Sequence, residues 1–313
     1  MFSGRDEFVS AGATKKISPG YLDSCMITIG RRFGSLSMVQ ILSALTFLIL
    51  LCGPFAAIAD QPLGPVPTTA DMSAKAVTTL LFQAKPGVRP DLSGKFLVYL
   101  DLSELNFKAA NLAHSDFYGA DFTGANLKGA DLSHTRLDRS VLMRADLSGA
   151  NLTGATILRP TIYADLSTNT QDAPRFTGAN LTEVHVQAEL SGSDFRGANL
   201  TRANFYPLEG RPGEGTLATT YRNILKYCDF SGAQLGSANL QRAVLWFAKF
   251  NGADLKDTNF MDADLSRADF SGANIAGADF TRADLDGANF VGAIGVSQAK
   301  GLDQAVNLDR ALR

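Results

Sequence analysis

The chain has 313 residues, which is enough for one long domain or two of ordinary size. Its formal net charge is -2 at pH 7, so it lacks the basic footprint of a nucleic-acid-binding protein, and no nucleic-acid partner is expected. The 29 glycines and 20 phenylalanines beside a single tryptophan indicate a repetitive composition.

Residues 1–59 are predicted to be an N-terminal extension followed by a signal for export. Two arginines precede an apolar run that has no charged residue from Phe33 to Ala59, and the run ends in an Ala-x-Ala pattern that starts at Ala57. These are the parts of a cleaved signal peptide, so we expect a periplasmic or extracellular bacterial protein. The run is also long enough to span a bilayer. The alternative is an uncleaved signal anchor that leaves the remainder facing the periplasm.

Residues 60–90 are predicted to form a linker and an N-terminal cap. The stretch from Asp71 to Gln83 has the pattern of a helix with an acidic start. We expect it to cover the open edge of the repeats that follow, because exposed strand edges need covering. Its predicted apolar face consists of Leu80, Leu81 and Phe82.

From residue 91 to residue 295 an apolar residue recurs every five positions, with two interruptions. The unit is a small residue, Asp or Asn, Leu or Phe, and two further residues, as in the segment 120–124 (ADFTG). A period of five fits neither a helix nor a flat strand. A unit of five residues cannot bury a side chain alone, so the chain must coil with each Leu or Phe facing a shared axis.

Residues of the same type recur at steps of twenty, which indicates four units per turn. Equal side chains would then form columns, and successive turns would stack without voids. Each buried Leu or Phe contributes about 1.5–3 kcal/mol. The predicted structural core consists of Phe230, Phe250, Phe270, Phe290, Leu225, Leu245, Leu265 and Leu285.

The polar position of the repeat supports the same count. At steps of twenty it alternates between carboxylate and amide, as in Asp91, Asn111, Asp131 and Asn151. Turns of a solenoid lie about 4.8 Å apart. Alternation therefore gives each carboxylate an amide neighbour instead of a second charge. We expect mild strain at the exceptions, Asp101 with Asp121 and Asp264 with Asp284.

These units resemble the pentapeptide-repeat family from about Asp91 to Gly295. The resemblance implies an all-β fold, a right-handed quadrilateral β-helix, here with short helical caps. Residues 296–313 are the predicted C-terminal cap, and its expected packing residues are Leu302, Val306 and Leu312. Relatives often dimerise through their C-terminal end, so a homodimer through that end is a further expectation.

Two interruptions are predicted, at 159–175 and at 206–223. The second is rich in Gly and Pro and is expected to project as a loop. The phase of the repeat also slips near Val186 and returns at Leu190. Long loops on a rigid scaffold often carry function. The alternative for both segments is a tolerated insertion.

One outward-facing group is a candidate partner surface. Tyr227 and Phe247 are twenty residues apart, and Trp246 lies beside Phe247. Lys226 is one turn before Trp246, and Arg267 is one turn after Phe247. Exposed apolar groups of this kind often mark partner sites. The alternative is that the second loop folds back and buries the rings.

No catalytic, metal or cofactor site is predicted. His114 and His134 are expected to be neighbours, but position 154 in the same column is glycine and supplies no third ligand. Cys228 takes an alanine position and is expected to be a small buried thiol. The Asp, Ser and Thr residues belong to the repeat, and no triad or nucleotide motif is present.

We therefore expect a non-enzymatic exported scaffold that binds a protein or envelope partner. The alternative comes from relatives that imitate DNA and bind gyrase or topoisomerase in the cytoplasm, a role that needs a strongly acidic face. Five arginines at one outward position of the repeat would interrupt such a face: Arg144, Arg202, Arg242, Arg267 and Arg282.

Overall fold

The computed structural model describes residues 67–163, 170–206 and 222–313. Residues Pro65–Arg313 form one compact unit, and the other unit is Met1–Gly64. The predicted signal peptide or anchor lies outside the described residues, as do the middle of the first interruption and most of the second. Within the described ranges, no helix is both long and apolar enough to cross a membrane.

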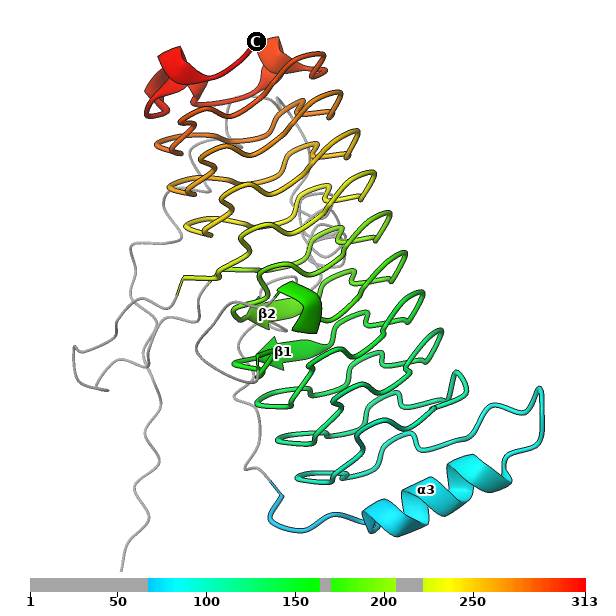
Figure 1. Ribbon diagram of the computed structural model, residues 1–313. Helices are drawn as coiled ribbons and strands as arrows, with labels where there is room; N and C mark the ends of the chain where they lie inside the picture. The colour runs from blue at the N-terminus through cyan, green and yellow to red at the C-terminus, as the bar shows by residue number, and fades with distance from the viewer. Residues whose placement is uncertain (1–66, 164–169, 207–221) are drawn as a thin grey trace, which may run out of the picture. The chain divides into compact units, whose positions relative to one another are not determined.

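The compact unit is a stack of turns joined edge to edge by parallel bridges (Figure 1). In its regular parts, each bridging residue pairs with the residue twenty positions later, and each turn has four such residues. The chain is therefore a solenoid. Its right-handed sense and quadrilateral section, which the resemblance implies, stay predictions. We name the four stacks of bridging residues the first, second, third and fourth column, and they begin at Asp91, Phe96, Asp101 and Asn106.

Regular strands are few in the described residues. They are β1 (Thr156–Leu158) and β2 (His185–Gln187), which pair in parallel with Ile157 opposite Val186. Elsewhere the pairing consists of isolated bridges. The chain turns too soon for longer strands, because in the regular units the second residue after the inward one takes a left-handed φ, as Arg267 does at 59°. The all-β prediction therefore holds for the parallel pairing and not for extended strands.

Phenylalanines stack along the axis of the coil inside the fourth column. The rings of Phe230, Phe250, Phe270 and Phe290 lie nearly parallel, with successive centroids 5.1, 5.0 and 4.8 Å apart. The stack continues below through Phe195 and Phe176, with centroids 4.8 Å apart at each step. The predicted leucines are buried inside the third column: Leu225, Leu245, Leu265 and Leu285. Aromatic pairs contribute about 0.5–1.5 kcal/mol beyond burial, so this column stabilises successive turns in register.

Amide and carboxylate side chains bridge neighbouring turns in the first column. The Nδ2 atom of Asn111 donates to Oδ1 of Asp91 at 3.1 Å, and Asn151 donates to Asp131 at 3.0 Å. The strain expected at Asp101 stays a prediction; its carboxylate accepts hydrogen bonds from Oγ and the backbone N–H of Ser103, at 2.6 and 3.1 Å. These bonds lower the pKa of Asp101.

The N-terminal cap is the helix α3 (Ala74–Gln83), which lies at the start of the coil (Figure 1). Ser73 caps it by accepting the N–H of Ala76 at 3.2 Å. The helix begins later than predicted, because Asp71 pairs with the edge of the first turn: its N–H donates to the carbonyl of Phe96, and its carboxylate accepts the Phe96 N–H.

The predicted apolar face of this helix is wrong at one residue. Val77 and Leu81 are buried and Leu80 is partly buried, whereas Phe82 is 85% exposed. Residues four apart share a helix face, so Val77 and Leu81 face the coil together, and the residue after Leu81 points away from it.

The first interruption is shorter than the predicted 159–175. Thr161 still bridges Val141 and Ile162 is buried, so the repeat continues to Tyr163. A short 3-10 helix, η2 (Thr170–Asp172), precedes the return of the repeat at Arg175.

An ion pair stabilises the point where the repeat resumes: Arg175 lies 2.7 Å from the carboxylate of Asp146 in the preceding turn. Partial burial acts to raise the pKa of Asp146. Hydrogen bonds from Ser148, Lys128 and Arg175 outweigh that effect and lower it to about 2.

The second interruption ends inside the coil. Asn223 is fully buried, and its Oδ1 accepts the N–H of Ala188 at 2.7 Å. Its Nδ2 donates to the carbonyls of Val186 and Phe205. The side chain of Asn223 thus bonds to backbone groups that precede the loop and fixes the point where the chain re-enters the coil.

The C-terminal cap is a last turn built from units of six residues. Its bridging residues are Ile294, Lys300, Val306 and Leu312. The 3-10 helices η3 (Val296–Gln298), η4 (Leu302–Gln304) and η5 (Leu308–Arg310) lie between them. Leu302 packs against the core as predicted. The predicted packing of Val306 and Leu312 is wrong: as bridging residues they point outward and are 50% and 60% exposed.

A half-buried polar pair lies where β1 meets β2, and two of its side-chain atoms are buried. Thr156 is opposite His185, and neither Thr156 Oγ1 nor His185 Nε2 has a hydrogen-bond partner among the described residues. Burial lowers the pKa of His185, while a hydrogen bond with the backbone of Tyr206 and the charge of Asp138 act in the opposite direction. The imidazole is therefore neutral in the folded protein at neutral pH.

We expect Phe250→Ala to lower the free energy of unfolding by about 3–5 kcal/mol, because it opens a cavity in the middle of the stack. Phe290→Ala is the matched control and should cost less, because Phe290 ends the column and has no ring above it. Urea denaturation of both variants measures the difference. Equal losses would contradict a continuous column.

We also expect the unfolding free energy to fall as the pH drops below about 6.5, the ordinary pKa of a histidine. In that range the histidine of the unfolded chain binds a proton, whereas the imidazole of His185 in the folded protein, with its lowered pKa, stays neutral. Acidification therefore favours unfolding. His185→Gln should flatten this part of the pH profile and leave the profile above pH 7.5 unchanged. The same slope in both proteins, measured by denaturation at each pH, would contradict a lowered pKa of His185.

Candidate interaction surface

The candidate surface belongs to the third column, directly after the second interruption. Ile224 bridges Glu189 in the turn before it and Val244 in the turn after it. The N–H of Tyr227 donates to the carbonyl of Trp246 at 2.9 Å. The residues that follow the loop are therefore already part of the rigid coil.

The structure brings all five predicted residues together. The rings of Tyr227 and Phe247 stack with centroids 5.2 Å apart and planes 10° apart. Nζ of Lys226 lies 4.3 Å from the ring centroid of Trp246, and Cζ of Arg267 lies 5.4 Å from that of Phe247. Such cation–π contacts contribute about 0.5–1 kcal/mol each at exposed sites. We call these five residues the interaction patch.

The rings of the interaction patch are exposed. Tyr227 is 52% exposed, and Trp246 and Phe247 are 38% exposed each. The alternative, that the second loop folds back over these rings, stays a prediction, because most of that loop lies outside the described residues. Tyr227 and Arg267 cover the two faces of the Phe247 ring, so solvent meets mainly its edge.

Two of these rings belong to residues whose backbone conformation is energetically unfavourable. Tyr227 and Phe247 have φ values of 60° and 56°, in the left-handed region. This conformation costs a residue with a Cβ about 1–2 kcal/mol. The fourth column has glycine at the equivalent position in every turn from Gly129 to Gly292. The third column thus has aromatic residues at positions where a glycine would avoid the energetic cost of the left-handed φ.

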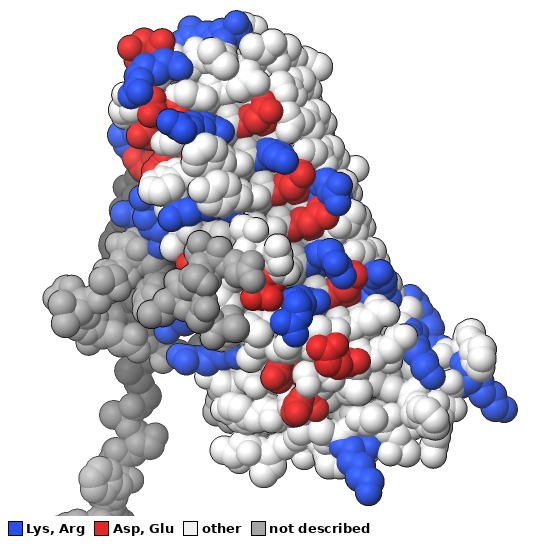
Figure 2. All heavy atoms as spheres, in the orientation of Figure 1, with Lys and Arg blue, Asp and Glu red and all other residues white. Residues whose placement is uncertain are grey.

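Charges of both signs are mixed over the coil. In the face that Figure 2 shows, acidic and basic side chains alternate along the length of the coil and do not separate into an acidic face. Three of the arginines expected to interrupt such a face form ion pairs: Arg144 with Glu104, Arg202 with Glu183, and Arg282 with Asp262.

The two predicted neighbours His114 and His134 do stack, with ring centroids 5.0 Å apart and planes 10° apart. Their faces meet, so their nitrogens do not converge on one point. His134 fills the space above Gly154, where an added Cβ would lie 2.6 Å from Nδ1. No cluster of three His, Cys, Asp or Glu side chains suited to a metal occurs in the described ranges.

Cys228 is a buried thiol inside the coil, as its alanine position predicts. Its Sγ donates to the carbonyl of Leu190 at 3.1 Å. Burial raises the pKa of this thiol far above its usual range. It therefore stays protonated and serves packing.

A second exposed aromatic group was missed from the sequence. It lies near the N-terminal end, where Tyr99 meets Tyr118 edge to face at 5.6 Å and Arg136 lies 4.7 Å from the Tyr118 centroid. The two tyrosines occupy different positions of their repeat units and are nineteen residues apart. A search for identical residues at steps of twenty does not pair them.

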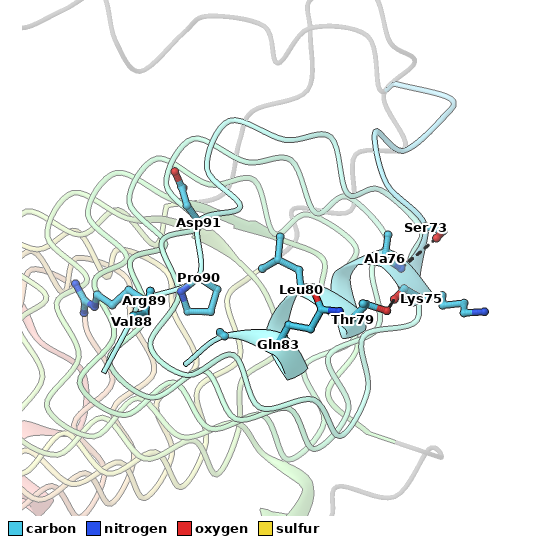
Figure 3. Close-up of a pocket in the computed structure, with 11 residues that line it drawn as sticks. Ser73, Lys75, Ala76, Thr79, Leu80, Gln83, Val88, Arg89, Pro90 and Asp91 are labelled. Atoms are coloured by element: carbon cyan, nitrogen blue, oxygen red, sulfur yellow. Dashed lines mark hydrogen bonds between the residues drawn. The ribbon is translucent and has the colours of Figure 1, made fainter. Parts of the chain in front are cut away.

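A groove of about 730 Å³ runs between α3 and the first turn (Figure 3). Leu80, Val88 and Pro90 line it, and Lys75 extends from the helix away from the coil. The two sides are tied together because Nζ of Lys108 donates to the carbonyl of Ala84 at the end of the helix, at 3.1 Å.

The sequence matches the family model for pentapeptide repeats in eight copies. The matched residues are 101–139, 120–157, 175–206, 228–267 and 263–294. These ranges follow the coil and leave out both interruptions and both caps. No curated protein matches the chain.

Several solved structures are similar to the chain. HetL, a pentapeptide repeat protein involved in heterocyst differentiation regulation from the cyanobacterium Nostoc sp. strain PCC 7120, is 27% identical, with 69% of this chain and 91% of HetL covered and a TM-score of 0.21. Full-length QnrB1, a plasmid-mediated fluoroquinolone resistance protein, is 15% identical, with coverages of 66% and 89% and a TM-score of 0.21. Rfr23 from the cyanobacterium Cyanothece 51142 is 18% identical, with coverages of 61% and 90% and a TM-score of 0.21.

Proposed function

Because the chain belongs to the pentapeptide-repeat family, we propose that it is a non-catalytic scaffold that binds another protein through the interaction patch. The single observation that carries this proposal is the ring stack of Tyr227 and Phe247, which is exposed although it sits on a rigid coil. Aromatic and arginine side chains dominate the binding energy of protein interfaces. The interaction patch supplies both kinds of residue in one place.

The scaffold acts outside the cytoplasm under this proposal. Support comes from the sequence, where the charge-free run from Phe33 to Ala59 ends in an Ala-x-Ala pattern. Cleavage there releases a chain that starts at Asp60 into the periplasm or beyond. An uncleaved run instead anchors the coil on the outer side of the membrane. In both cases the partner is a protein of the cell envelope.

A photo-crosslinking residue at position 246 of the full-length chain, used in the producing bacterium, tests both the partner binding and the export. We expect a crosslinked partner in the periplasmic or envelope fraction, and a recovered chain whose N-terminal sequence starts at Asp60. With the purified partner, Trp246→Ala with Phe247→Ala should weaken binding about a thousandfold, since hot-spot residues contribute about 2 kcal/mol or more each and every 1.4 kcal/mol is a factor of ten.

Tyr99→Ala is the matched control, because Tyr99 is another exposed ring at a left-handed position and lies far along the coil. It should leave the affinity unchanged. Unchanged affinity in the Trp246 and Phe247 double variant would refute the patch. A full-length chain confined to the cytoplasm would refute the export.

The last turn supports a second proposal, a homodimer through the C-terminal end. Ile294, Val306 and Leu312 expose apolar side chains there. The backbone carbonyls of Ala299 and Ala305 accept no backbone hydrogen bond among the described residues, so the edge is open. A two-fold dimer brings the same apolar surface of two copies together and covers both edges.

Sedimentation analysis tests the dimer. We expect the full-length protein to sediment as a dimer at micromolar concentration, and Ile294→Asp with Leu312→Asp to make it monomeric by burying two charges at the contact. Phe82→Ser is the control, because it removes an exposed ring at the opposite end of the coil. A monomeric wild-type protein, or a double variant that stays dimeric, would show that this end is not the contact.

A further inference from the structure

A small polar cavity lies beside the end of the second interruption, in the turns after the loop. Its volume is about 370 Å³, and it is lined by Arg222, Gln241, Arg242 and Asp262. Arg242 and Asp262 occupy the same outward position of their units in successive turns, next to the second column. Arg222 joins them from the first described residue after the loop.

Arg222 is held in place by a backbone contact. Its Nε donates to the carbonyl of Arg242 at 2.7 Å. This bond uses one of the five N–H groups of the guanidinium and directs the two terminal nitrogens elsewhere. Neither of these nitrogens has a hydrogen-bond acceptor or an acidic partner among the described residues.

The one carboxylate of the cavity is already paired. Nε and Nη2 of Arg282 donate to the two oxygens of Asp262, both at 2.7 Å. This two-point bond from Arg282 is the main reason that the pKa of Asp262 is lowered. Arg282, in the next turn, thus neutralises the negative charge of Asp262.

Arg242 interacts electrostatically with Asp262 but is not directly paired with it. In the part of the chain that the structure describes, its guanidinium forms no ion pair and donates no hydrogen bond. The cavity and Arg282 together hold three guanidinium groups and one carboxylate, which leaves two positive charges. Six further described arginines do lie within 4.0 Å of an acid, whereas others such as Arg89 and Arg267 make different contacts. The paired ones are Arg136, Arg144, Arg175, Arg196, Arg202 and Arg310.

We propose that the cavity formed by Arg222, Gln241 and Arg242 binds an oxyanion group. The two guanidinium groups offer several N–H donors to a planar or tetrahedral cluster of oxygens, and bonds between charged partners are about twice as strong as neutral ones. The amide of Gln241 lines the same cavity and already contacts Sδ of Met261 at 3.6 Å and the carboxylate of Asp262. A phosphate group and a carboxylate share this chemistry. The site is separate from the five residues of the interaction patch, although both flank the third column.

Calorimetric titration of the full-length protein at constant ionic strength tests the proposal, with inorganic phosphate in one arm and an acetylated tri-aspartate peptide in the other. We expect at least one of them to bind with a dissociation constant of about 1 mM or lower. Tighter binding of phosphate identifies a phosphate group as the natural ligand, and tighter binding of the peptide identifies an acidic protein segment.

Arg242→Gln and Arg222→Gln should each weaken binding at least tenfold, and Arg222→Lys should weaken it less, because it keeps the charge but loses the planar fork. Arg202→Gln is the matched control, since that arginine is exposed and already paired with Glu183 at 2.7 Å. Trp246→Ala should also leave anion binding unchanged, which separates this site from the proposed partner surface.

The variants remain interpretable because Arg222 and Arg242 lie at the surface, and thermal unfolding will show that the coil is intact. Absence of binding in both arms would overturn the proposal. Binding that persists unchanged in Arg242→Gln, or that falls equally in Arg202→Gln, would overturn it as well.

Discussion

A side-chain oxygen that accepts the backbone N–H two residues later sets the corners of the coil. Asp91 does this for Ser93 at 3.0 Å, Asp121 for Thr123 at 2.8 Å, and Asn259 for Met261 at 2.9 Å. Only short side chains that end in an oxygen reach this N–H, and so the repeat has Asp or Asn at this position. This hydrogen bond stabilises the tight turn around each inward residue. The chain therefore reaches the next bridging position five residues later. The stacked rings inside the coil depend on that regular return.

The same register decides what the surface offers. A side chain at a left-handed position leans toward the next turn, and a glycine there makes room for it: the ring of Tyr99 fills the space over Gly119, and the imidazole of His134 fills that over Gly154. Where the next turn has no glycine, the side chains contact each other instead. In the third column this gives the stack of Tyr227 on Phe247. Beside the second column it places Arg242 next to Asp262. Both candidate sites therefore arise from which residues stand twenty positions apart.

Much of this arrangement is predictable from the sequence because contacts follow a fixed step. The phenylalanine column, the grouping of Trp246 with Lys226 and the burial of Cys228 all come from that step. Prediction failed where the step changes. Val306 and Leu312 were misplaced because the last turn uses six-residue units, for which the alanines at 299, 305 and 311 were the available signal. The contact between Arg222 and Arg242 was missed because Arg222 belongs to an inserted segment and occupies no position of the repeat. The bonds of Asn223 to the backbone before the loop were missed for the same reason, because Asn223 ends the inserted segment.

The insertions also show what the coil requires of the chain. Bridging partners lie 35 residues apart across the second loop, as for Glu189 and Ile224, where the regular distance is twenty. The rings of Phe195 and Phe230 nevertheless stack across it at 4.8 Å and 6°. The stacking energy depends on which residues face each other and not on how much chain connects them. A loop can therefore vary in length and sequence while the coil beneath it stays intact. Residues in the turns beside such a loop have a rigid backbone, while the loop next to them is free to vary in sequence. Both the interaction patch and the arginine cavity lie in the turns directly after the second loop.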